Sequence, residues 1–238
     1  MVPQSSHRSR GRLSPSGTRR LVSAPQFEQK FIGLSSVCSY TNQMHVTKQD
    51  VQKKLHSTEP SHLPHCRGRA AVAFVISGRS NPMLTLCIKA SHLRKHAGEV
   101  SLPGGKLEDD DRSAVAAALR ELHEETGLQL EQHDALGYLN PIESLYELSV
   151  IPCVFWSDTV LQGSPQEQEI ADVFTIPLTE FIEQTPRFEL SRRRLPERWM
   201  PRWRYNNVDI WGLTALIVND FFETVFNARF QEAPPSKL

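Results

Sequence analysis

The most informative stretch of the chain reads Arg120-Glu121-Leu122-His123-Glu124-Glu125-Thr126-Gly127-Leu128. On a helix, Glu121, Glu124 and Glu125 occupy positions i, i+3 and i+4, so all three carboxylates project from one face. Apolar residues at the same spacing predict an adjacent buried face: Val115, Ala118, Leu119 and Leu122. The stretch therefore predicts an amphipathic helix from about Arg112 to Thr126, closed by Gly127.

The acids on this helix favour a metal site. A solvated acidic face is the ordinary explanation of such a cluster, but those faces usually place Lys or Arg one turn from each acid. Four residues after Glu121 comes Glu125, and four after Glu124 and Glu125 come Leu128 and Gln129. Convergent carboxylates without compensating cations are the ligands that Mg²⁺ or Mn²⁺ prefers.

The residues around the helix resemble the Nudix box, a Gly followed by an acid and then by Arg-Glu-apolar-x-Glu-Glu-x-Gly-apolar. Its positions are filled here by Gly105, Asp111, Arg120, Glu121, Leu122, Glu124, Glu125, Gly127 and Leu128. The interval from Gly105 to Arg120 is one residue longer than in the general box. The acidic position, counted back from Arg120, therefore falls on Arg112, with Asp111 beside it.

The longer form of the box, beginning Gly-Gly-Lys, is similar to the coenzyme A diphosphatase branch of the Nudix hydrolases. The upstream segment from Leu93 to Gly105 is similar to the additional signature of that branch. Two places differ: Lys89-Ala90 stand where the branch usually has Arg-Ser, and Leu102 stands where it has Phe. Lys keeps the positive charge but lacks the bidentate fork of Arg, so a phosphate contact there would be less well oriented.

The resemblance implies a fold and an activity. The fold is α/β (α+β), a Nudix-type α/β/α sandwich with a mixed sheet between helices. The activity is an enzymatic hydrolysis of a diphosphate bond that depends on Mg²⁺ or Mn²⁺. This chemistry needs a nucleophilic water and neutralisation of the charge that develops on phosphoryl oxygens, and divalent metal ions supply both.

The resemblance also implies roles for individual residues. Glu121 and Glu125 are expected to be metal ligands, and Glu124 a third ligand or the catalytic base. Arg120 is expected to hold the glutamates by charge-assisted hydrogen bonds. Gly104 and Gly105 would let the backbone turn tightly against the helix and the metal.

Further candidates lie outside the box. Glu167 and Glu169, on an expected loop, are either a second candidate base or exposed surface acids. Arg94 and His96 belong to the upstream signature and are candidates for substrate contact, although a histidine on a surface loop is the simpler interpretation. From residue 186 to residue 204, seven arginines stand against two glutamates, with two tryptophans interleaved.

This arginine-rich segment has three interpretations. Arg forks such as Arg193 and Arg194 suit phosphate, and Trp suits stacking, so the segment is a candidate clamp for a 3′-phospho-ADP end. A nucleic-acid patch is disfavoured by the zero formal net charge of the chain. The remaining interpretation is a solvated basic loop.

The resulting hypothesis is metal-dependent hydrolysis of coenzyme A and its derivatives, giving 4′-phosphopantetheine (or its acyl form) and 3′,5′-ADP. The alternatives are hydrolysis of another nucleoside diphosphate derivative, such as NADH or ADP-ribose, and a non-catalytic nucleotide-binding Nudix module. The intact set of Glu121, Glu124 and Glu125 argues against a pure binding module. The expected partner is a small molecule, not nucleic acid or a membrane, and the oligomeric state is left open.

Composition and length fit one catalytic domain with extensions. We expect an extension over residues 1–43, a helical lead-in over 44–68, the catalytic domain over 69–228 and a tail over 229–238. The four cysteines form no C-x-x-C pair and indicate reduced thiols: Cys38, Cys66, Cys87 and Cys153. No apolar run approaches the ~18 residues of a membrane span.

Both ends carry targeting-like features. Residues 1–27 are rich in Arg and Ser and contain no acid, which predicts disorder or a mitochondrial transit peptide; alternatively, translation begins at Met44. The last three residues, Ser236-Lys237-Leu238, match the peroxisomal import signal. We expect a peroxisomal address in a eukaryotic source and a cytoplasmic one in a bacterial source.

Overall fold

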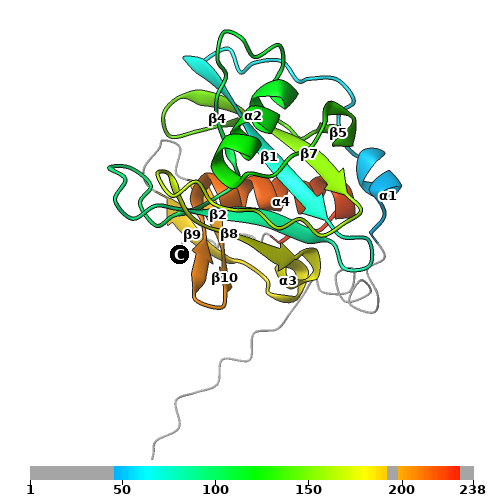
Figure 1. Ribbon diagram of the computed structural model, residues 1–238. Helices are drawn as coiled ribbons and strands as arrows, with labels where there is room; N and C mark the ends of the chain where they lie inside the picture. The colour runs from blue at the N-terminus through cyan, green and yellow to red at the C-terminus, as the bar shows by residue number, and fades with distance from the viewer. Residues whose placement is uncertain (1–45, 192–197, 231–238) are drawn as a thin grey trace, which may run out of the picture. The chain divides into compact units, whose positions relative to one another are not determined.

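Strand β1 (Gly68–Ser77) lies in the middle of the main sheet of the computed structural model, which describes residues 46–191 and 198–230. It pairs antiparallel with β2 (Met83–Lys89) and parallel with β7 (Leu148–Ser157), so the sheet is mixed, as expected (Figure 1). The other strands of this sheet are β3 (Val100–Ser101), β4 (Gly104–Lys106), β5 (Ala135–Tyr138), β6 (Ile142–Glu143) and β8 (Ile170–Pro177).

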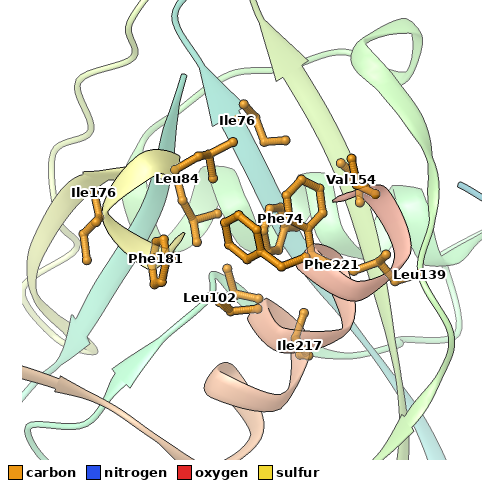
Figure 2. Close-up of a cluster of buried hydrophobic side chains, with 14 of the residues drawn as sticks. Phe74, Ile76, Leu84, Leu102, Leu139, Val154, Ile176, Phe181, Ile217 and Phe221 are labelled. Carbon is orange, nitrogen blue, oxygen red and sulfur yellow. The ribbon is translucent and has the colours of Figure 1, made fainter. Parts of the chain in front are cut away.

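Successive side chains along β1 and β7 point to opposite faces of the sheet. Each face packs against a different helix. One face packs against α2 (Ala114–Thr126) through Ala71, Ala73, Val75, Ile151, Cys153 and Phe155. The opposite face packs against α4 (Gly212–Phe226) through Phe74, Ile76, Val154 and Trp156. The Phe74 and Phe221 rings stack with centroids 4.4 Å apart, in the cluster that Figure 2 shows. The α/β/α sandwich is confirmed.

Helix α2 is defined at both ends by local chemistry. The Ser113 side chain accepts a hydrogen bond from the Ala116 N–H (3.1 Å), which satisfies one of the free donors at the helix start. Gly127 closes the helix with φ of 67°, a left-handed conformation that glycine adopts without strain, and its N–H donates to the His123 carbonyl (2.8 Å). The expected C-terminal glycine is confirmed, and the helix begins two residues after Arg112.

A second sheet lies after the main one in the chain. It contains β9 (Arg187–Ser191), β10 (Arg198–Tyr205) and β11 (Val208–Ile210) in the order β11-β10-β9. The arginine-rich segment is thus largely β-structure, and the solvated-loop interpretation is wrong for its described part. Trp203 is buried in the core and donates its indole N–H to the Phe181 carbonyl (3.0 Å). The remaining short helices are α1 (Lys48–Gln52), η1 (Gln132–Asp134) and α3 (Leu178–Glu183).

Some expectations fall outside the described residues: Arg193, Arg194, residues 1–43 and the Ser236-Lys237-Leu238 terminus. The domain boundaries and the address drawn from these segments stay predictions. None of the helices in the described ranges combines the length and apolar character that crossing a bilayer requires.

Candidate active site

Glu125, in the last turn of α2, is a buried carboxylate with only 3% of its surface exposed. Lys89, at the end of β2, places its Nζ 2.5 Å from Glu125 Oε1. The N–H of Gly104, in β4, donates to the other oxygen, Oε2, at 3.3 Å. Burial raises the pKa of Glu125, while the Lys89 charge and the Gly104 N–H oppose that rise. Three separate elements therefore fix one carboxylate.

Glu121 lies one turn earlier on the same face of α2 and rests directly on Gly105. A Cβ atom at Gly105 would overlap the Glu121 carboxylate, so glycine is required for this close approach. Burial raises the pKa of Glu121, and the Arg120 guanidinium opposes that rise. The Gly-Gly pair thus brings the backbone into contact with the buried Glu125 and the half-buried Glu121.

Arg120 connects the acids to one another. Its Nη1 lies 3.0 Å from Glu121 Oε1 and 3.0 Å from Glu124 Oε2, and its Nη2 donates to Asp111 Oδ2 (3.0 Å) and to the Lys106 carbonyl (3.2 Å). The hydrogen bond from Arg120 lowers the pKa of Asp111. Glu124, by contrast, has more than half of its side chain exposed.

The expectation that these acids lack cations is wrong. Counting four residues forward from each glutamate missed Arg120, which lies four residues before Glu124, and missed Lys89, which comes from a strand. Both cations nevertheless leave an excess of negative charge. Five carboxylates, those of Glu108, Asp111, Glu121, Glu124 and Glu125, lie next to two positive side chains, Arg120 and Lys89, so the cluster keeps an excess of formal negative charge. Oxygen ligands with this residual charge fit a divalent cation such as Mg²⁺ or Mn²⁺.

A cavity of about 1140 Å³ opens beside this cluster. Its wall includes Lys89, Gly104 and Gly105 on the side of the glutamates. It also includes the basic loop that contains Arg94, Lys95 and His96, so the structure brings the two upstream candidates, Arg94 and His96, to the same cavity. The cavity therefore extends from the residues that contact the glutamates to exposed positive charge.

The lining of the cavity is partly aromatic. Tyr146 lies in contact with the basic loop: the His96 ring meets it edge-on with centroids 5.7 Å apart, and Lys95 Nζ lies 4.7 Å from its centroid. His96 Nδ1 is also 2.7 Å from Glu99 Oε2. Trp211 lines the cavity as well, with the Arg202 guanidinium 5.7 Å from its ring. Sequence reasoning missed Tyr146 because it stands in no motif. Arg202 belongs to the arginine-rich segment, but the tryptophans interleaved in that segment are Trp199 and Trp203, so the contact with Trp211 was not predicted either.

The loop with the second candidate base lies against the end of α2. The Gln166 N–H donates to the Glu125 carbonyl (3.1 Å), and the Ala90 N–H donates to the Glu169 carbonyl (2.8 Å). The side chains of Glu167 and Glu169 themselves are exposed. The backbone is thus fixed next to the site, and the catalytic role of either acid stays a prediction.

Comparison with known proteins agrees with this geometry. The NUDIX domain family matches residues 67–199. The chain belongs to the Nudix family. A relative from Enterobacter sp. (strain 638), described as an uncharacterized Nudix hydrolase NudL, is 36% identical over 156 residues, which cover 65% of this chain and 81% of the relative. The NudL of Yersinia pestis (strain Pestoides F) is 37% identical over 159 residues, covering 66% and 79%.

Among solved structures, a MutT protein from Methanosarcina mazei Go1 is similar, with a TM-score of 0.40 and 25% identity over 51% of this chain and 84% of that one. As a Nudix hydrolase, the protein is an enzyme that acts on phosphoric anhydrides, with a nucleoside diphosphate derivative as substrate. Nudix hydrolases generally use divalent metal ions, which the excess negative charge of the cluster fits.

The two glycines of β4 should respond differently to substitution. In Gly105→Ala the new methyl group meets the tip of the Glu121 side chain, which can swing away, so we expect near-normal stability but at least tenfold weaker Mn²⁺ binding and activity. In Gly104→Ala the methyl group meets the Ala71 carbonyl and the Val72 backbone, which cannot move, so we expect a lower melting temperature. Thermal melts and Mn²⁺ titrations of both variants measure these effects. An equal loss of melting temperature in Gly105→Ala and Gly104→Ala would contradict the predicted difference.

A second pair of variants tests which residue fills the acidic position of the longer box. Asp111 accepts two hydrogen bonds from Arg120, whereas Arg112 is exposed. Asp111→Ala should lower stability by about 1.5 to 3 kcal/mol, the usual contribution of a hydrogen bond to a charged group, and should lower turnover by releasing Arg120. Arg112→Ala should leave both unchanged. Urea unfolding and steady-state kinetics measure these effects; the reverse ranking would assign the position to Arg112.

Proposed function

We propose that the protein hydrolyses the diphosphate bond of coenzyme A and its derivatives, releasing 3′,5′-ADP and 4′-phosphopantetheine or an acylated form of it. This proposal narrows the general Nudix activity to one substrate class. It is supported by the Gly-Gly-Lys form of the box and the upstream segment from Leu93 to Gly105, both of which resemble the coenzyme A branch.

The observation that carries the proposal is the cavity that extends from Lys89, Gly104 and Gly105, which contact the glutamates of α2, past a basic loop to aromatic side chains. Its volume of about 1140 Å³ exceeds the ~300 to 1,000 Å³ usual for small-molecule pockets, so it suits a long substrate. Arg94 and Lys95 offer positive charge for phosphate groups. Leu145, Tyr146 and Leu213 offer apolar surface suited to a pantetheine arm or a base.

In this proposal, Glu121 and Glu125 hold Mg²⁺ or Mn²⁺, with Glu124 as a third ligand or as the base. The bound ion would supply Lewis-acid stabilisation of phosphoryl charge and a more acidic water. Arg120 keeps Glu121 and Glu124 oriented, and the Gly104 N–H keeps one oxygen of Glu125 in place. The protein thus contributes preorganised carboxylates, which need no rearrangement when substrate binds.

Product analysis tests the substrate assignment. We expect purified enzyme with Mg²⁺ or Mn²⁺ to release 3′,5′-ADP from coenzyme A, with kcat/KM about ten- to hundredfold above that for dephospho-coenzyme A, because a charge-assisted contact to the 3′-phosphate contributes about 1.5 to 3 kcal/mol. Arg94→Ala should reduce this ratio, whereas Arg187→Ala, exposed on β9 and outside the cavity wall, should not.

Arg193→Ala and Arg194→Ala belong in the same experiment, because these arginines were the sequence-based candidates for the 3′-phosphate. Equal efficiency on coenzyme A and dephospho-coenzyme A would remove the 3′-phosphate contact from the proposal. Faster release of AMP from NADH or ADP-ribose than of 3′,5′-ADP from coenzyme A would replace the proposed substrate by one of these dinucleotide derivatives.

Glu125→Gln tests the metal-binding role. The amide oxygen can still accept from Gly104, but the ligand charge is lost and Lys89 loses its ionic partner. We expect turnover to fall by about two to three orders of magnitude and Mn²⁺ affinity to fall with it. Glu183→Gln, an exposed acid on α3, is the matched control and should leave both unchanged. Near-normal turnover of Glu125→Gln at saturating Mg²⁺ would rule out the role.

A further inference from the structure

Three side chains of the types that bind metal ions lie close together at a place separate from the glutamates of α2: His65, Cys66 and Glu143. One potential ligand atom from each lies within 4.8 Å of the others. Cys66 is buried, with 8% of its surface exposed, whereas His65 is exposed at the protein surface. His65 Nε2 already lies 3.2 Å from Glu143 Oε2. The three side chains therefore form a compact group with one side open to solvent.

The group is built from two segments that are tied together by other bonds. The Arg67 N–H donates to the Glu147 carbonyl (2.7 Å), and the side chains of the same two residues form an ion pair. The Leu63 N–H donates to Ser149 Oγ (3.2 Å). Glu143 itself pairs with Ser149 in the β6–β7 ladder. The backbone that carries the three side chains is thus fixed independently of any ion, which reduces the ordering cost of binding one.

The distances between the three ligand atoms suit a metal ion with tetrahedral coordination. A point central to three atoms no more than 4.8 Å apart lies within about 2.8 Å of each. Shifts of at most about 0.5 to 0.8 Å therefore reach Zn–S bonds of about 2.3 Å and Zn–N or Zn–O bonds of about 2.0 to 2.2 Å. In a tetrahedral site with such bonds, a nitrogen and an oxygen ligand are about 3.3 Å apart. The observed separation of 3.2 Å between His65 and Glu143 matches that edge.

The ligand chemistry differs from that of the α2 cluster. Thiolate and imidazole ligands favour Zn²⁺ over Mg²⁺ or Mn²⁺, which prefer oxygen alone. We propose that His65, Cys66 and Glu143 form a Zn²⁺-type site with three protein ligands and one open position. This site is independent of the coenzyme A proposal, because it shares no ligand with the glutamates of α2.

A cation bound there would link the segment before β1 to the end of β6. Glu143 and the neighbouring Ser144, Leu145 and Tyr146 line the large cavity, so the ion would also brace the wall of that cavity. Since the site is formed by the folded chain, Zn²⁺ should stabilise the native state by mass action. The expected role is therefore structural support of the cavity wall.

Cobalt substitution tests the site with a signal that the glutamates cannot produce. Full-length protein is freed of metal with a chelator and titrated with Co²⁺, and the sulfur-to-cobalt charge-transfer band in the near ultraviolet is recorded. We expect a band that saturates at one equivalent and is abolished by Zn²⁺. Cys66→Ser should lose it, whereas Cys38→Ser, Cys87→Ser and Cys153→Ser should keep it; Cys87 and Cys153 are buried in the core.

Two further variants separate this proposal from misfolding and from the α2 site. His65→Ala keeps the thiol and alters an exposed position, and it should weaken Co²⁺ binding at least about tenfold and abolish the rise in melting temperature with Zn²⁺. Glu121→Gln/Glu125→Gln should keep the band. Absence of the band in the wild type, its persistence in Cys66→Ser, or its loss in Glu121→Gln/Glu125→Gln would overturn the proposal.

Discussion

The burial of one carboxylate, Glu125, is the constraint on which the active-site region depends. An ionised carboxylate loses several kcal/mol of hydration when it leaves water, so it persists only where partners replace that hydration. Lys89 and the Gly104 N–H are those partners, and they come from β2 and β4. β2 and β4 pair with different parts of the same edge of β1, while β7 pairs with the other edge, so this strand arrangement also sets the electrostatics of α2.

The longer Nudix box is accommodated because the additional residue lies in the loop between β4 and α2, where the helical period does not fix the position of each residue. Within α2 the helical period fixes Arg120 relative to the three glutamates, and no insertion is tolerated there without turning an acid to another face. Between the end of β4 at Lys106 and the helix N-cap Ser113, the chain follows a loop, so Asp111 can reach Arg120 although counting in sequence points to Arg112. Spacing rules are strict inside a helix and permissive in the loop before it.

The same distinction explains how far the sequence predicted the fold. Local periodicity was sufficient for α2, because this helix has a strong apolar pattern and a clear C-terminal glycine, Gly127. The ion pair between Lys89 and Glu125 was not predictable, since it joins residues from a strand and a helix. Strand β10 was missed because its Arg content suggested solvent exposure. Its alternation of Arg202 and Arg204 with Trp203 and Tyr205 was a usable signal, with Trp203 buried.

Lysine at position 89 has a consequence for the oxygens of Glu125. A carboxylate offers about four lone-pair positions, and the compact ammonium of Lys89 occupies one on Oε1 while the Gly104 N–H takes one on Oε2. An arginine would extend a planar fork toward both oxygens at once and compete with the backbone N–H for Oε2. Lysine thus leaves one lone pair on each oxygen for a metal ion, and this geometry favours Glu125 as a metal ligand and disfavours Lys89 as a phosphate fork.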